Sequence, residues 1–207
     1  MKKIVLIFLS VLSISCSAIA EIDMQDFYAK NSKQLNAVLD KKFEKSSSWE
    51  GGKELAFPLF MKTEMPSDIS SMVHTPDGLL VKTTKSKVSF IRESSDDIFF
   101  VREGSSLLEA YSDAFTMDMN ELEKKYATYT TEKQGIFDFK IGLSIPSYED
   151  KGYYQIDDFT IYVLLGKNSS EAFILNRGKP NMAMRVGYLG VDRNEFKKLI
   201  TNIENFN

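Results

Sequence analysis

The feature that most constrains the fold is a repeated change in the spacing of apolar residues along the chain. After residue 54, several short segments alternate apolar and polar residues, which is typical of strands with one buried face. Other segments place apolar residues every three to four positions, which predicts amphipathic helices. Because runs of strands stand next to runs of helices, the pattern favours an α+β fold over a parallel β-α-β fold.

The segments follow one another in the order α-ββββ-αα-ββββ-α. This order predicts antiparallel sheets of about seven to eight strands in two meanders, packed by three or four helices. Two arrangements fit it. Residues 21–207 can form a single α+β domain around one curved sheet, or two similar lobes can divide the chain into residues 21–130 and 131–207.

In the first half of the chain, Asp23 is a suitable N-cap for a helix over residues 23–44. Residues 63–77 are predicted to be a loop, which holds the only histidine, His74. The predicted strands cover residues 55–62 (which include Pro58), 79–83, 87–92 and 97–102.

In the second half, capping boxes at Ser106–Glu109 and Asp118–Glu121 predict a broken helix pair over residues 106–129. Alternation over residues 136–145 predicts a half-buried strand. Three more strands are predicted over residues 159–165, 172–176 and 182–189, and a final helix begins near Asp192. Its apolar face is expected to contain Phe196, Leu199, Ile200, Ile203 and Phe206.

The N-terminus has the pattern of a secretory signal peptide over residues 1–20. Lys2 and Lys3 precede an apolar run of about eleven residues, which is too short to span a bilayer. Ala18 and Ala20 form a small-x-small cleavage site, so we expect a mature chain that begins at Glu21 and is located in the periplasm of a bacterium.

The competing interpretation of the leader uses Cys16, the only cysteine. Lipidation there would anchor the protein to a membrane, although Ser13 stands where lipoprotein signals usually have Leu. Cleavage after Ala20 leaves no cysteine, so stability would come from packing and not from disulfides. Removing Lys2 and Lys3 from the 26 basic residues leaves 24 against 29 acidic ones, a net charge of −5. This balance argues against nucleic acid or anionic membrane as a partner, and no transmembrane segment is expected in the mature chain.

The sequence contains no motif that specifies chemistry. A single histidine and no mature cysteine leave no catalytic triad that can be recognised, and we expect His74 to be a solvated loop residue. No metal ligand, cofactor or catalytic residue is predicted. A hydrolase would need a carboxylate pair, which the sequence cannot identify among 29 acidic residues.

Residues 146–158 are unusual because this predicted connection is much longer than most meander turns. It is expected either to pack its tyrosines on the sheet edge or to form an acidic, aromatic recognition loop, since tyrosine is enriched at binding surfaces. The candidate partner-binding residues are Tyr148, Glu149, Asp150, Tyr153, Tyr154, Asp157 and Asp158.

These observations predict a non-enzymatic periplasmic binding or inhibitor protein that acts on a basic protein partner. An immunity protein against a secreted toxin is one example. Two alternatives stay open: a carrier of a small apolar ligand held between sheet and helices, and a hydrolase with an unidentified carboxylate pair. The sequence does not indicate an oligomeric state.

Overall fold

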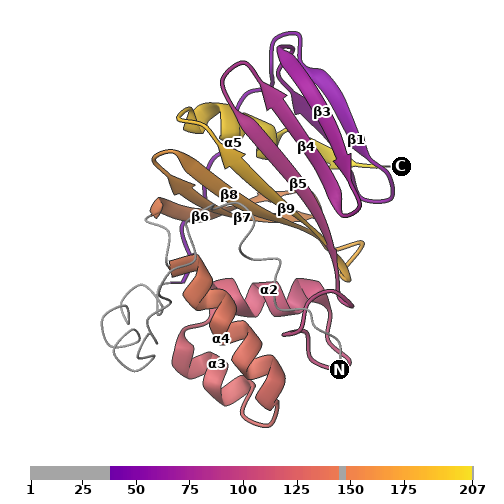
Figure 1. Ribbon diagram of the computed structural model, residues 1–207. Helices are drawn as coiled ribbons and strands as arrows, with labels where there is room; N and C mark the ends of the chain where they lie inside the picture. The colour runs from indigo at the N-terminus through magenta and orange to yellow at the C-terminus, as the bar shows by residue number, and fades with distance from the viewer. Residues whose placement is uncertain (1–37, 145–147, 207) are drawn as a thin grey trace, which may run out of the picture.

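The computed structural model describes residues 38–144 and 148–206, and its largest element is a seven-stranded antiparallel sheet (Figure 1). The strand order is β3-β4-β5-β9-β8-β7-β6. The strands are β3 (Ile69–Thr75), β4 (Gly78–Thr83), β5 (Lys87–Ser94), β6 (Tyr148–Ile156), β7 (Phe159–Gly166), β8 (Ser169–Asn176) and β9 (Met182–Leu189).

A second antiparallel sheet has the order β1-β2-β10. Its strands are β1 (Lys53–Phe57), β2 (Met61–Met65) and β10 (Ile203–Asn205). The described helices are α2 (Leu107–Thr116), α3 (Met119–Lys125), α4 (Thr130–Ser144) and α5 (Arg193–Thr201). The predicted α+β class, built on antiparallel strands with helices between them, is confirmed.

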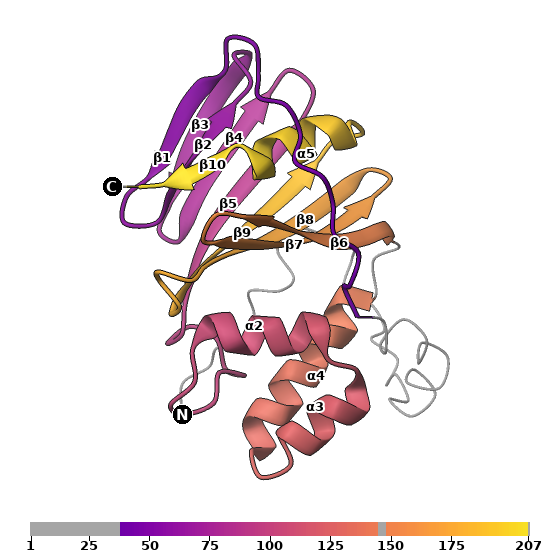
Figure 2. The same cartoon turned by 180° about the vertical axis from the view of Figure 1, so that it is seen from behind.

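The elements form layers around the large sheet. Helices α2, α3 and α4 lie on one side of it, and α5 with the small sheet lies on the other side (Figures 1 and 2). Strands β7 and β8 lie between these layers and are largely buried on both faces. In β7, for example, Ile161 and Val163 contact the first core, while Tyr162 and Leu164 contact the second.

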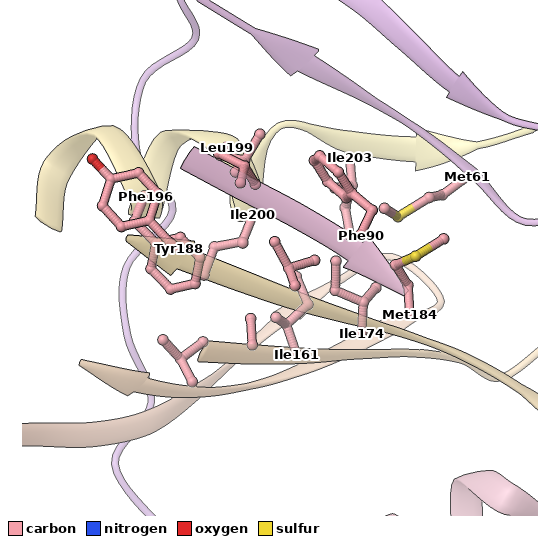
Figure 3. Close-up of a cluster of buried hydrophobic side chains, with 14 of the residues drawn as sticks. Met61, Phe90, Ile161, Ile174, Met184, Tyr188, Phe196, Leu199, Ile200 and Ile203 are labelled. Carbon is pink, nitrogen blue, oxygen red and sulfur yellow. The ribbon is translucent and has the colours of Figure 1, made fainter. Parts of the chain in front are cut away.

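The core between the sheet and α5 is mainly aliphatic. Figure 3 shows Leu199 and Ile200 of α5 close to side chains of the sheet such as Ile174, and all three are at most 2% exposed. The core under α2–α4 is instead rich in aromatic rings. Phe115 stacks on Tyr162 of β7 with ring centroids 4.5 Å apart. Aromatic pairs of this kind add to the stability that burial alone provides.

Strands from the first and the second half of the chain join in one sheet through β5 and β9. These strands pair over eight residues each, from Lys87 opposite Leu189 to Ser94 opposite Met182. The seven-stranded sheet therefore contains strands from both residues 21–130 and residues 131–207.

The strand predicted over residues 136–145 is wrong over its described part, because residues 136–144 belong to helix α4. The segment fits two periods at once. Phe137, Phe139 and Ile141 alternate as in a strand, but Ile136, Phe139 and Leu143 also recur at helical spacing. The helix buries Ile136 completely against α2 and the sheet.

Lys140 explains why the helical period is hard to recognise. It lies on the buried side of α4, 6% exposed, and its Nζ donates to the carbonyl oxygen of Met117 at the end of α2. A lysine at this position provides a hydrogen-bond donor for a carbonyl oxygen at the C-terminus of α2. The strand prediction instead places Lys140 on the outward, polar face of the segment. Burial lowers the pKa of Lys140 to about 8.

Four predictions in the first half need correction. Residues 23–37 of the helix predicted over residues 23–44 lie outside the described residues. Residues 38–44 are not helical and contain an isolated β-bridge at Lys42. Residues 55–62 divide into β1 and β2 around a turn that contains Pro58. The loop predicted over residues 63–77 contains the end of β2 and all of β3. Residues 97–102 form turns, because Phe100 packs among rings of α2 and α4 and not beside a strand.

The helix pair and the last helix agree with the sequence, with one boundary shifted. Asp118 and Glu121 form the predicted capping box, and the Ser106 side chain accepts from the backbone of Glu109. Helix α5 buries Phe196, Leu199 and Ile200 but ends at Thr201. Ile203 is instead the first residue of β10, where it pairs with Thr63 of β2, and Phe206 follows β10.

Candidate functional site

The segment predicted to be a recognition loop is strand β6, one edge of the seven-stranded sheet. Its residues therefore point to both faces. Tyr154 is 1% exposed, and its ring lies 5.3 Å from that of Phe43, while Tyr148 and Tyr153 pack partly against the helix-side core. Burial, with a contribution from the Asp150 charge, raises the pKa of Tyr154 to about 12. The loop predicted over residues 146–158 is therefore wrong over residues 148–156, which form β6.

The acidic residues of this segment have different surroundings. Glu149 accepts a hydrogen bond from Arg193, and Asp150 pairs with Lys41 at 2.8 Å. Asp157 and Asp158 are exposed in the turn between β6 and β7. The structure does not bring these residues into one patch with the tyrosines, so their role in binding stays a prediction.

The outer edge of β6 is covered by residues 41–43, which we name the N-terminal strap. The Phe43 amide donates to the Tyr153 carbonyl oxygen at 2.8 Å, and the Tyr153 amide donates to the Lys41 carbonyl oxygen at 2.9 Å. Gly152 permits this approach, because a Cβ there would lie 2.3 Å from the Lys41 oxygen. The strap satisfies backbone groups that an edge strand would otherwise expose.

The opposite edge of the sheet is strand β3, which has β4 as its one strand neighbour within residues 38–144 and 148–206. Residues 70–75 are all exposed. The sequence of β3, Ile-Ser-Ser-Met-Val-His-Thr, contains no proline, lysine or acid. Edge strands are usually protected from pairing with other chains by such residues, and β3 has only a bulge near Ser71.

Next to this edge, one face of β3, β4, β5 and β9 carries exposed apolar side chains. Strand register places Val73 opposite Leu80, and puts Ile91 and Leu189 on the same face. We name these four residues the open face. Their exposed fractions are 53% for Val73, 41% for Leu80, 39% for Ile91 and 47% for Leu189. Figure 1 shows that β3 and β4, which carry Val73 and Leu80, lie away from α2–α4.

The middle of the open face is flat because its central positions have small side chains. Ser89 lies opposite Leu80, and Gly187 lies opposite Ser89. A Cβ at Gly187 would come within 2.6 Å of the Ser89 Oγ. The apolar residues therefore surround a shallow area that an extended chain or a flat protein surface can approach closely.

Charges differ at the two ends of the open face. At the β4–β5 turn, Lys82 lies directly opposite Lys87, and Lys85 is exposed in the turn itself. Toward the helices, Arg185 pairs with Glu171 at 3.0 Å. The end of the open face that lies away from α2–α4 therefore has three lysines. One acid is also present there, because Asp68 accepts hydrogen bonds from Thr84 in the same turn, and Ser86 of this turn donates to Glu195 of α5.

A polar cluster lies where the open face meets α2. The Tyr111 hydroxyl donates to Glu93, and burial raises the pKa of Glu93. The hydrogen bond from Tyr111 and the charge of Arg185 lower this pKa in part, and the charges of Glu171 and Asp97 raise it. The hydrogen bond from Tyr111 to Glu93 connects α2 with β5, and the bond from Arg185 to Glu171 connects β9 with β8. Glu93 and Glu171 therefore hold elements of the fold together.

A surface depression of about 560 Å³ lies at the start of α5. Its lining includes Lys167, Asp192, Arg193 and Lys197, so it is polar and not the apolar pocket that a carrier needs. Among the described residues, no group of three or more His, Cys, Asp or Glu side chains is arranged to hold a metal ion. The described helices include none that is both long and apolar enough to cross a membrane.

Sequence reasoning does not find the open face, although a signal for it is present. In the predicted hairpin, Leu79, Leu80 and Val81 are consecutive apolar residues, so one of them must point away from the core of an antiparallel sheet. Ile91 likewise follows Phe90 directly. Apolar residues at outward positions indicate either a second covering layer or a contact surface. No model of a known protein family and no curated protein matches the chain.

Proposed function

We propose that this protein is a non-enzymatic binding or inhibitor protein that engages a protein partner through the open face. The observation that carries the proposal is the set of four exposed apolar side chains, Val73, Leu80, Ile91 and Leu189, beside an unprotected strand edge. Apolar patches with polar margins are typical of protein contact sites. The lysines at one end and the Arg185–Glu171 pair at the other supply those margins.

The surface also changes the expected charge of the partner. The sequence predicts a basic partner because of the acidic charge of the whole domain and the tyrosines and acids of residues 146–158. Two of these acids, Asp150 and Glu149, pair with Lys41 and Arg193 of this chain. The open face has lysines at its edge instead, so the partner that fits it is acidic there. An immunity-type inhibitor remains one form of this function.

Photo-crosslinking in the producing cell tests the proposal. A photoreactive phenylalanine analogue at Leu80 should give a discrete adduct with another protein, and the same analogue at Lys124, exposed on α3, should not. Adding Ile91→Asp to the Leu80 probe should reduce the adduct at least tenfold, because a buried unpaired charge opposes docking. Equal adducts at both probe positions, or no adduct at Leu80, would contradict the proposal.

The proposed compartment is the periplasm, with a mature chain that begins at Glu21. The intact mass of the exported protein checks this directly. A mass that begins at Cys16 and includes acyl chains would show a lipid-anchored protein instead, and Cys16→Ala would then release it from the membrane.

A further inference from the structure

We infer that the partner adds an acidic, extended strand to the edge of β3 that has no strand neighbour among the described residues. This inference rests on the proposed function and specifies how the same surface recognises its partner. The occupant is a segment of another protein that pairs with β3 by backbone hydrogen bonds. It places one apolar side chain beside Val73 and a carboxylate beside Ser71.

The backbone of β3 supports pairing with an added strand. A strand with one neighbour directs alternate N–H and C=O groups outward, and an extended peptide can pair with them. Six successive residues, 70–75, are exposed, and Ser70 Oγ already bonds the Lys82 carbonyl oxygen on the inner side. At the other edge of the sheet, the N-terminal strap pairs with β6 in this way, through Lys41 and Phe43.

The lysines at the β4–β5 turn support an acidic occupant. Lys82 and Lys87 face each other across two neighbouring strands, and like charges in that position repel. Among the ion pairs within residues 38–144 and 148–206, none includes either of these lysines. A carboxylate brought to this end of the sheet would relieve the repulsion and gain attraction from both cations.

The strand spacing shows how the carboxylate reaches Lys82. Ser71 lies opposite Lys82, on the same face as Val73 and Leu80. A strand added beyond β3 lies two strand spacings from β4, or about 10 Å. Because the Ser71 side chain is small, a Glu or Asp beside it and the long Lys82 side chain can meet above it. The expected motif is therefore an apolar residue and an acid two positions apart, on one face of the added strand.

A phage-displayed library of random twelve-residue peptides, selected against the purified protein, tests this motif. Enriched peptides should alternate apolar and polar residues and contain the apolar-x-acid pair. A synthetic copy of the best peptide is then the probe. Its Kd should rise at least tenfold with Lys82→Glu and Lys87→Glu combined, and it should not change with Lys124→Glu, a charge reversal on α3. Methylation of alternate peptide amides should weaken binding at least tenfold in one of the two registers and leave the other nearly unaffected, as expected when one edge of the peptide pairs with β3.

The outcomes separate this inference from the proposed function. Peptides that depend on Leu80 but tolerate both lysine reversals, or all amide methylations, would overturn the acidic strand and leave the binding function in place. Leu80 adducts in the cell without any selected peptide would do the same, and would indicate recognition of a folded surface. A dimer in light scattering that is lost with Leu80→Asp would show that a second copy occupies the face. Failure of both the peptides and the adducts would overturn both proposals.

Discussion

The two edges of the seven-stranded sheet differ in how their backbones are protected. At β6, the N-terminal strap supplies backbone partners for Tyr153, and Phe43 packs on the buried Tyr154 ring. At β3, residues 70–75 are exposed, and β4 is the one strand neighbour among the described residues. Within the described residues, one edge is thus paired with another segment of the chain, and the other edge has β4 as its one strand neighbour.

This difference shows that aromatic and acidic composition alone does not identify a contact surface. Residues 146–158 have the composition of a recognition site, but Tyr154 serves the core there and Asp150 holds Lys41 of the strap. Strand β3, which contains no tyrosine and no acid, forms the exposed edge instead. Stability should therefore depend on β6 side chains, and binding should depend on β3 and its neighbours.

The largest expected effect is a difference in the free energy of unfolding between two variants, one with a change at each edge of the sheet. Tyr154→Ala should lower the free energy of unfolding by about 3–5 kcal/mol, because it empties a fully buried ring site. Val73→Ala should change it by no more than about 0.5 kcal/mol, since Val73 is 53% exposed. Urea denaturation of both variants measures the difference. Similar losses would mean that the two edges contribute equally to the fold.

An intermediate effect is expected at the contact between β6 and the strap. In Gly152→Ala, the added Cβ would lie 2.3 Å from the Lys41 oxygen and 2.6 Å from the Phe43 ring, so the strap must shift. We expect a loss of about 1–3 kcal/mol in the free energy of unfolding. Hydrogen exchange at the Tyr153 amide, which the strap protects, should become faster.

Gly142→Ala is the matched control for this change. Gly142 lies in α4, and a Cβ added there would have no neighbouring atom within 4 Å, so alanine should stabilise the helix by about 0.5–1 kcal/mol. Equal behaviour of the two variants, or unchanged exchange at Tyr153, would show that the strap does not constrain β6.

The smallest expected effect is on the pH dependence of stability at the closed edge. Burial lowers the pKa of Lys151 in β6, so the unfolded chain binds more protons as the pH approaches 10.5, the ordinary pKa of lysine. Stability should therefore rise with pH in the range just below 10.5. Lys151→Met should make this rise smaller, as urea denaturation at several pH values will show. If the free energy of unfolding of Lys151→Met rises with pH as much as that of the unchanged protein, the Lys151 ammonium is solvated in the folded state and this prediction is wrong.

The elements that the sequence predicts best are those that bury apolar side chains, because burial gives them a regular apolar pattern. Helix α5 and strands β7–β9 have strong apolar patterns and lie where the sequence predicts them. Strand β3 has no buried face, so its pattern contains no period, and pairing with β4 alone makes it a strand. In α4, the buried Lys140 hides the helical period, because its favourable partner is a carbonyl oxygen far away in sequence.

The candidate site is harder to predict for a related reason. The open face depends on which side of β4 and β5 the helices fail to cover, and this follows from how far the sheet extends, a property of the whole fold. Leu80 and Ile91 are apolar in any context, so only the three-dimensional arrangement distinguishes an exposed contact residue from a second core.

The pairing of β5 with β9 also has a consequence for the order of folding. Lys87–Ser94 find their partners in residues 182–189, almost a hundred positions later, and the apolar layer over the same sheet comes from α5 and β10 at residues 193–205. Contacts between such distant segments form slowly, since a long loop must close first. Strands β3–β5 therefore cannot complete their fold until the last part of the chain is available. For a chain that crosses a membrane from its N-terminus, this delay would keep the leading half unfolded during translocation and make folding a single late event.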